Sequence, residues 1–183
     1  MKKKLSIILT IVMVLTVLSV APVSAGEDKP ISGRIDLDLE LSLCLPVENA
    51  PNPLYPFVTW VGTVVIDGTT YGWADFPTAD FVVEGNLVYF AEYWTIFTLA
   101  EGEDPTVDLA CDGDLVVLAG TNTGFGTPGG TYKADGKVTV IDETGPFDDV
   151  AYGSTMMWRG KVTNLKEAGG DEFKATFHIF PPK

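Results

Sequence analysis

The feature that most constrains this chain is a repeated alternation of apolar and polar side chains, with almost no pattern of helical period. It is clearest in residues 34–45. The apolar positions there are Ile35, Leu37, Leu39, Leu41, Leu43 and Leu45, and mostly polar residues stand between them. Successive side chains of a β-strand point to opposite faces, so this run predicts a long strand with one face toward a core and one toward water.

Similar runs recur along the chain, with turn residues between them. The expected strands are residues 34–45, 57–66, 69–76, 81–83, 87–98, 115–121, 132–140, 156–162 and 173–180. Asp67-Gly68 between two of these runs is a strong hairpin signal. About eight strands at this spacing are typical of an antiparallel barrel or sandwich, and we expect a small closed barrel. Neither an internal repeat nor a linker divides residues 26–183, so they should form a single domain.

The first 25 residues have the pattern of a secretory signal peptide. Lys2-Lys3-Lys4 is basic, residues 5–20 are mainly apolar, and Val23-Ser24-Ala25 is a small-residue cleavage site. We therefore expect residues 1–25 to be removed and the protein to be secreted or held in the cell envelope. The alternative is an uncleaved membrane anchor, since the apolar run approaches spanning length.

The chain is strongly acidic, with 25 acidic and 12 basic residues and a formal net charge of −13. Removal of residues 1–25 would take away three lysines and no acid, and would change this charge to −16. Such a surface repels nucleic acids and anionic lipids, so we expect neither nucleic acid nor, after cleavage, a membrane as partner. The charge has two interpretations: solubility outside the cell, or a diffuse surface that attracts calcium.

Cys44 and Cys111 are the two cysteines of the chain. An exported protein meets an oxidising environment, which favours one disulfide between them. The bridge would close a loop of about 67 residues and would contribute roughly 4 kcal/mol through loop-closure entropy. Because Cys44 falls on the polar face of the first expected strand, the bridge should lie outside the core or at a strand end. Two free buried thiols are the alternative.

Residues 130–165 contain two alternating runs joined by an unusual connection. Gly145-Pro146 must end the first run, because proline has no N–H to give to the sheet. Phe147 and Val150 flank two aspartates. We expect these two apolar side chains to plug one end of the barrel while Asp148-Asp149 stays in water.

This part of the sequence resembles the allene oxide cyclase-like and dirigent-like barrels of the broad calycin kind. The matching features are a Gly-rich turn, a strand with small residues, a Gly-Pro-Phe connection and a Gly-containing return strand, within residues 115–165. They are Gly124-Phe125-Gly126, Gly129-Gly130, Thr131-Tyr132 with Ala134 and Gly136, Thr144-Gly145-Pro146-Phe147 and Trp158-Arg159-Gly160. The resemblance implies a small antiparallel barrel with an apolar lumen, often dimeric or trimeric. It also implies either binding of hydrophobic small molecules or cyclisation of reactive ones. The family's catalytic positions do not map onto this chain.

No motif points to a metal or a cofactor. His178 is the single histidine and lies on the polar face of the last expected strand. Residues 124–129 match a G-x-G-x-x-G fingerprint in form, but Pro128 lies inside it and an alternating strand follows instead of a helix. Three aspartates near Cys111 lack the spacing of an EF-hand loop. We therefore expect no metal and no cofactor.

Residues 87–98 are the most informative stretch for ligand binding, because both faces of this expected strand are apolar and aromatic. One face would line the lumen, and a packed segment or a second copy of the chain in a homo-oligomer would cover the other. Glu92 interrupts an apolar face. If it is buried, its pKa would rise and it could act as a catalytic acid, with Arg159 as counter-charge. The alternatives are a Glu92 that reaches the barrel mouth and an exposed Arg159.

The candidate ligand-binding residues are aromatic or flexible side chains on three of the expected strands. They are Tyr71, Trp73, Tyr89, Trp94 and Met157. Aromatic residues at this spacing are also common in an ordinary core. Three functions follow from these patterns: binding of a small hydrophobic molecule in the lumen, an isomerase or cyclase that acts on a reactive apolar substrate, and a structural or interaction protein without a ligand.

Overall fold

The computed structural model describes residues 30–163 and 171–182, so the expected signal peptide (residues 1–25) lies outside the described residues. Within this part, the chain forms nine strands and three short helical turns. The strands are β1 (Ile31–Leu43), β2 (Phe57–Ile66), β3 (Thr69–Pro77), β4 (Val82–Glu84), β5 (Leu87–Phe97), β6 (Val116–Gly126), β7 (Thr131–Ile141), β8 (Thr155–Thr163) and β9 (Glu172–Phe180). The helical turns are η1 (Val47–Asn49), α2 (Val107–Ala110) and η2 (Gly113–Leu115). None of the described helices is long and apolar enough to cross a bilayer.

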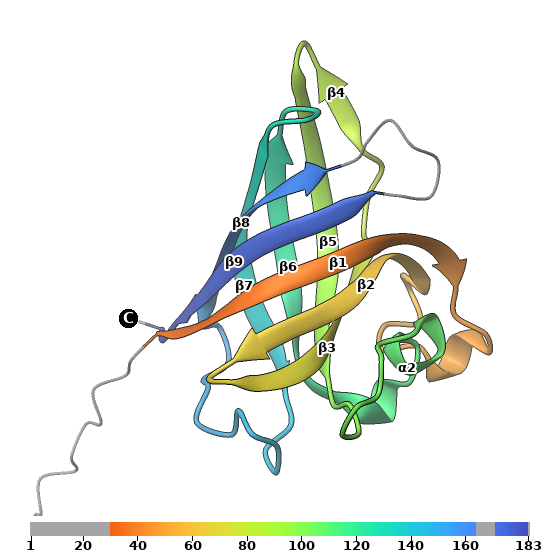
Figure 1. The fold of residues 1–183 in the computed structure, drawn as a ribbon, viewed down its shortest axis with the longest axis vertical. Coiled ribbons are helices and arrows are strands. Elements are labelled where there is room, and N and C mark those ends of the chain that lie inside the picture. The colour runs from red at the N-terminus through yellow and green to blue at the C-terminus, as the bar shows by residue number, and fades with distance from the viewer. Residues whose placement is uncertain (1–29, 164–170, 183) are drawn as a thin grey trace, which may run out of the picture.

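The strands form one antiparallel sheet that closes on itself. Their order is β3-β2-β1-β9-β8-β7-β6-β5-β4, and β3 also pairs with β5. This last pairing joins the ends of an eight-stranded barrel (Figure 1). Both β4 and β3 pair with the same edge of β5, β4 with residues 87–89 and β3 with residues 92–97. The tip of the β4–β5 hairpin therefore projects beyond one end of the barrel (Figure 1). The expected closed barrel is confirmed, and the short β4, which overlaps the expected strand at residues 81–83, lies outside its eight strands.

The barrel interior is filled by alternate side chains, as the sequence pattern predicted. In β9, the buried positions are Phe173, Ala175, Phe177 and Ile179, and the residues between them are exposed. At the centre, the indole of Trp73 stacks on that of Trp94 with ring centroids 5.3 Å apart. Phe177 packs against Trp73 at 5.7 Å. Burial of these large rings removes much apolar surface from water and is a main source of stability.

One end of the barrel is closed by the connection between β7 and β8, which Figure 1 shows at the lower end of the molecule. Phe147 is 4% exposed and belongs to the interior core, and Val150 packs against the same core. The ring of Phe147 lies 5.3 Å from that of Tyr71. Asp148 and Asp149 between them are exposed. The plug expected from the sequence is confirmed, and we call Phe147 and Val150 the plug below.

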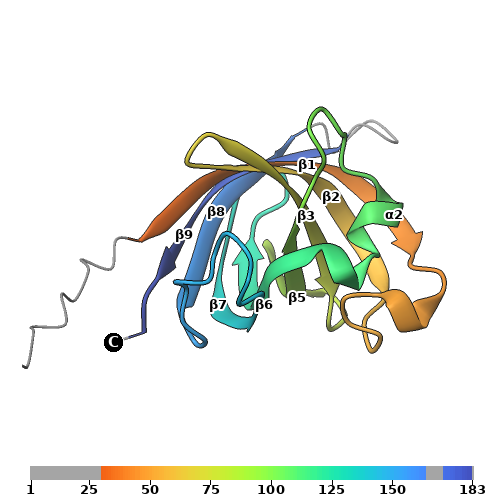
Figure 2. The same cartoon turned by 90° about the horizontal axis from the view of Figure 1, so that it is seen from below.

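A second apolar layer covers the outside of β2, β3, β5 and β6. The segment around α2 and the loop after β1 lie against the outer face of the barrel (Figure 2). Tyr93 and Phe97, on the outer face of β5, are buried under this layer. The Cys44–Cys111 disulfide ties its two parts together, with Cα atoms 5.3 Å apart. Both faces of β5 are therefore covered by the chain itself over residues 92–97. The bridge lies just after the end of β1, outside the barrel interior.

The glycine-rich stretch at the end of β6 has a different conformation from the one expected. Residues 124–130 were expected to form a turn, but β6 continues to Gly126, and Gly124 and Gly126 pair with Ala134 and Tyr132 of β7. A methyl group on Gly124 would collide with the ring of Phe90, and one on Gly126 with the ring of Tyr132. These glycines therefore give space to aromatic rings within the sheet, and only the four residues after Gly126 turn the chain.

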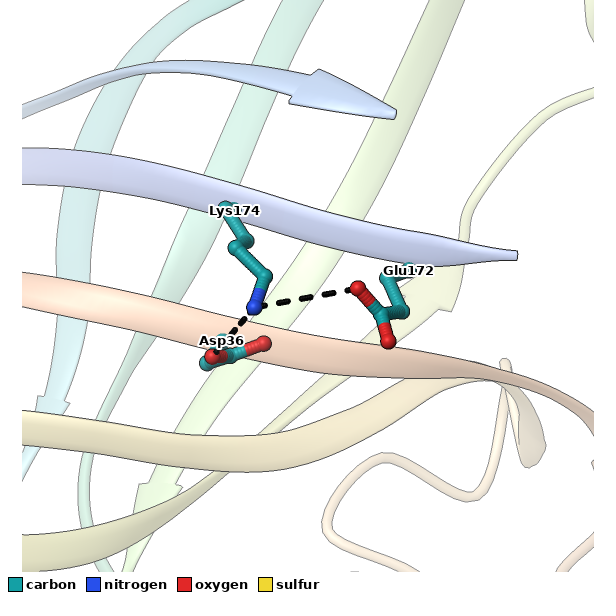
Figure 3. A network of polar contacts seen from close by, with 3 residues as sticks. All are labelled: Asp36, Glu172 and Lys174. Carbon is teal, nitrogen blue, oxygen red and sulfur yellow. Dashed lines mark ion pairs between the residues drawn. The ribbon is translucent and has the colours of Figure 1, made fainter. Parts of the chain in front are cut away.

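The polar face of β1 lies outside the barrel. Figure 3 shows Lys174 of β9 between two carboxylates, with Nζ 3.1 Å from Asp36 and 3.7 Å from Glu172. Lys174 and Asp36 are also direct partners across the β1–β9 pairing. All three side chains are about half exposed, so water screens the attraction and the pairs contribute little to stability.

Candidate functional site

A cavity opens at the end of the barrel opposite the plug. Its volume is about 210 Å³. It is bounded mainly by the ends of β1, β3 and β8 and the beginnings of β2, β5, β7 and β9. Its aromatic walls are Trp60, Phe81, Phe90, Tyr132, Trp158 and Phe173. Aliphatic side chains complete the walls, and the described lining residues include two carboxylic acids, Asp75 and Glu92, but no lysine, arginine or histidine.

The outer rim of this cavity is apolar and open to water. Leu41 and Phe81 line the cavity and yet are 65% and 57% exposed. Val82 and Val83 of the projecting β4–β5 hairpin are also exposed. Large apolar side chains in this position offer a path along which an apolar molecule can reach the interior.

Small residues make room for the aromatic walls. A methyl group on Gly160 would collide with the ring of Phe173, as one on Gly124 would with Phe90. The rings of Phe90 and Trp158 are stacked with centroids 5.6 Å apart, and Phe173 meets Trp158 edge-on at 5.0 Å. The walls are thus fixed by ring packing rather than by flexible side chains.

Glu92 of β5 lies in the wall of this cavity and is 8% exposed. Its Oε1 accepts a hydrogen bond of 2.8 Å from Nε1 of Trp158 and one of 3.4 Å from Nδ2 of Asn122. Burial raises the pKa of Glu92 to about 7, although both hydrogen bonds act in the opposite direction. Near neutral pH this carboxyl group is therefore present in both its protonated and its charged form.

Asp75 of β3 is the second carboxylic acid of the cavity and is 4% exposed. Its Oδ1 accepts a hydrogen bond of 2.8 Å from Nε1 of Trp73. Burial, and then the negative charge of Glu92, raise the pKa of Asp75 well above its ordinary value, while the bond from Trp73 lowers it. The two acids therefore oppose each other's ionisation.

Asn122 of β6 links the acids to the aromatic core. Its Oδ1 accepts a 3.1 Å hydrogen bond from Nε1 of Trp94, and its amide nitrogen donates to Glu92. The same nitrogen lies 3.6 Å from the sulfur of Met156. Asn122 is 2% exposed, so it holds Glu92 in place from beneath without contact with solvent.

The structure brings together only part of the predicted site. Glu92 is buried in the wall of the cavity, as the interpretation of a buried Glu92 with a raised pKa expected. Trp73 and Trp94 lie deeper, in the stacked core, and each donates its indole N–H to the polar network around the acids. Tyr71 lies at the opposite end against Phe147.

Three predicted site residues face away from the barrel interior. Arg159 is exposed on the outer surface of β8 with Met157, so of its two interpretations the exposed Arg159 is confirmed and the counter-charge to Glu92 is wrong. Met157 is 47% exposed, and Tyr89 is 37% exposed and packs against Phe125 outside the barrel. The physical reason is the two-residue period of a strand: Arg159 and Met157 alternate with Trp158, which points inward.

Asp75 and Asn122 were missed by the sequence analysis. Asp75 follows Trp73 by two residues, so the alternation already placed it on the inner face of β3. Asn122 lay just beyond the expected end of its strand at residue 121. For Asp75, the available signal was its register with the aromatic Trp73. Asn122 has Gly120 and Gly124 as its neighbours on the same face, so its own strand offered no such signal.

The site's chemistry is that of carboxyl groups and aromatic rings. Within residues 30–163 and 171–182, no three His, Cys, Asp or Glu side chains come close enough to hold a metal ion. A protonated Glu92 can donate a hydrogen bond or a proton, and a charged one can accept a proton or attract a cation. The rings supply apolar surface and π-faces.

No family model, no curated protein and no solved structure matches this chain.

Proposed function

We propose that this protein is exported and that its barrel binds a small, mainly apolar molecule in the cavity at the open end. The observation that carries this proposal is a cavity of about 210 Å³ with aromatic walls and two buried carboxyl groups, in a barrel whose other end is filled by its own plug. Binding pockets for small molecules typically combine apolar walls with a few polar groups that orient the ligand.

The size of the cavity favours a small ligand, or one end of a longer one. Typical pockets for drug-sized ligands are roughly 300–1,000 Å³, and this cavity is smaller. A longer molecule would have to extend over the exposed rim at Leu41 and Phe81. The apolar character of that rim favours such a contact.

The two acids support a ligand-binding function because they do not stabilise the fold. Burial of a carboxyl group without a cationic partner opposes folding, and aromatic or aliphatic residues would fill the same place better. Neither Asp75 nor Glu92 has a cationic partner among the described residues. Perturbed acids of this kind in a cavity are typical of functional sites.

Two observations support export. The signal-peptide pattern of residues 1–25 directs a chain across the membrane. The Cys44–Cys111 disulfide is of a kind that persists mainly in oxidising compartments.

The test is titration of the purified protein with the uncharged fluorescent probe N-phenyl-1-naphthylamine. We expect saturable binding that Val88→Trp weakens at least tenfold, because Val88 lines the cavity and the indole would occupy it. The matched control is Val140→Trp on the exposed outer face of β7, which should leave binding unchanged. Absence of saturable binding, or equal effects of both substitutions, would contradict the proposal and favour a structural protein without a ligand.

A second candidate function is an isomerase or cyclase of the allene oxide cyclase-like kind. The observation that favours it is the pKa of Glu92 at about 7, which suits a group that exchanges protons near neutral pH. Glu92→Gln separates the two candidates. If the protein only binds its ligand, the Glu92→Gln variant should still bind the neutral probe. If the protein is an enzyme, the variant should bind the probe but lose turnover of an allene oxide generated in the assay.

A further inference from the structure

We propose that the molecule held in this cavity carries a positively charged primary ammonium group, which lies against Glu92 and Asp75. The inference rests on the proposed function and adds the chemical class of the ligand: a small amine with an apolar body.

The first argument is the charge inside the cavity. Its titratable lining residues are Asp75 from β3, Glu92 from β5 and Tyr132 from β7. Burial raises the pKa of Tyr132, so its hydroxyl stays neutral. Since the lining residues that the structure describes include no cationic side chain, the charge that can develop in the cavity is negative.

The second argument is the number of unused acceptors. Glu92 accepts both of its hydrogen bonds on Oε1, and Asp75 accepts its side-chain bond on Oδ1. Within the described chain no hydrogen bond reaches Oε2 of Glu92 or Oδ2 of Asp75, although both residues are more than nine-tenths buried. A primary ammonium has three N–H donors, whereas a hydroxyl has one. An ammonium can therefore satisfy both carboxyl groups at once.

The third argument is the position of the two acids on adjacent strands. In the β3–β5 pairing, Asp75 lies opposite Trp94 and Pro77 opposite Glu92. Asp75 and Glu92 are thus diagonal neighbours on the same face, a relation in which side chains can reach a common point. The negative charge of Glu92 also raises the pKa of Asp75, in keeping with this diagonal placement.

The fourth argument is the aromatic wall. Phe90 and Trp158 stack beside Glu92, and Phe173 packs edge-on against Trp158. Faces of aromatic rings attract cations, most strongly where water is excluded. An anionic ligand such as a fatty acid would instead meet two acidic groups and no cation. The combination of buried acids and rings is suited to an ammonium and opposes a carboxylate.

The experiment compares three probes with the same carbon skeleton by calorimetry on the purified protein: phenethylammonium, 2-phenylethanol and phenylacetate. At pH 8.5 and physiological salt we expect phenethylammonium to bind at least tenfold more tightly than the alcohol, and phenylacetate to bind least. Because Glu92 has a pKa of about 7, protonation at pH 5.5 should weaken ammonium binding by about 30-fold if the charged form is required. The affinity for 2-phenylethanol should not fall in this way between pH 8.5 and pH 5.5.

Variants then locate the effect. Glu92→Gln keeps an acceptor for Trp158 but removes the charge, and should lower ammonium affinity at least tenfold while alcohol binding persists. Asp75→Asn is a second test in case the first variant does not fold, and should act in the same direction. The control is Glu84→Gln, which removes an exposed acid of β4 outside the cavity lining and should change ammonium affinity less than twofold.

Each other outcome is decisive. If 2-phenylethanol binds as tightly as phenethylammonium, or if Glu84→Gln weakens binding as much as Glu92→Gln, the ammonium inference is overturned and the proposed function stands. The same holds if N-phenyl-1-naphthylamine binds but phenethylammonium does not. If no probe binds saturably, both the inference and the proposed function are wrong.

Discussion

The two ends of the barrel are built from the same strands but are finished in opposite ways. At the plugged end, Phe147 and Val150 pack against the apolar interior core, and the ring of Phe147 meets that of Tyr71. At the open end, the space is left as a cavity and two carboxyl groups are buried beside it. Since the chain fills one end of the barrel with its own side chains, the barrel fold as such does not require a cavity at the other end.

This difference indicates that the plugged end serves mainly stability and the open end mainly binding. Filling the plugged end removes apolar surface from water and stabilises the fold. Leaving a cavity and burying acids both oppose folding. We therefore expect substitutions at the plugged end to destabilise the protein without a specific effect on binding, and substitutions at the open end to change binding and pH dependence.

The largest effect should come from the plug. Phe147→Ala removes a ring that is only 4% exposed and should lower the free energy of unfolding by about 3–5 kcal/mol. Urea unfolding followed by tryptophan fluorescence measures it. The control is Tyr152→Ala in the same connection, where the side chain is 59% exposed and the change should stay within about 0.5 kcal/mol. A loss below about 1 kcal/mol for Phe147→Ala would mean that the two ends do not differ in this way.

The next effect is a pH dependence that arises at the open end. The folded pKa of Glu92, about 7, lies above its value in the unfolded chain. Between pH 4.5 and 7 the folded state therefore binds more protons than the unfolded state, and stability falls as pH rises. A shift of this size corresponds to about 3 kcal/mol, lost by pH 8.

Urea unfolding at several pH values between 5 and 8 tests this prediction. Asp75 acts in the same direction, since its pKa is also raised. Glu92→Gln should therefore reduce the fall in stability without abolishing it, and should be more stable than the parent protein at pH 8. A parent protein whose stability is constant or increases from pH 5 to 8 would show that Glu92 does not retain its proton in the fold.

The smallest effects are expected from the removal of one polar group at each end of the barrel. Trp158→Phe removes the N–H that donates to Glu92 and should lower stability by about 1–3 kcal/mol, more at pH 8 than at pH 5, because the lost bond favours the charged acid. Tyr71→Phe removes a hydroxyl that makes no hydrogen bond to the described residues, and should change stability by less than about 0.5 kcal/mol. Chemical denaturation at both pH values measures the pair, and equal effects of the two substitutions would contradict the comparison.

Much of the fold could be predicted from local patterns. The alternation in residues 34–39 and 173–180 placed the inner and outer faces of β1 and β9 correctly, because a strand's side-chain period depends only on its own backbone. Beyond residue 39 the expectation was wrong: the β1–β2 pairing shifts register between Leu39 and Ser42, Leu43 and Leu45 are exposed, and Cys44 is buried. The plug was also predictable, since Gly145-Pro146 must end a strand and Phe147 is apolar. The disulfide followed from a pair of cysteines in a chain whose first 25 residues have the pattern of an export signal.

The site was predicted only in part. Glu92 could be singled out because it interrupts an apolar face. The sequence left open whether Arg159 is its counter-charge or is exposed, and the structure places Arg159 on the outer side of the sheet. Asp75 and Asn122 were missed because their importance comes from their neighbours. Each is an ordinary polar residue in its own strand and becomes part of a site only when β3, β5 and β6 are paired in register.

By itself, the sequence determined which segments are extended, which of their faces are apolar and where the chain must turn, since these depend on residues close together in the chain. Only the tertiary structure decided that β3 pairs with β5 to close the barrel, that one end is filled while the other stays open, and that two acids share a cavity. These features depend on contacts between distant segments, and a shift of one residue in a single pairing would exchange inside for outside.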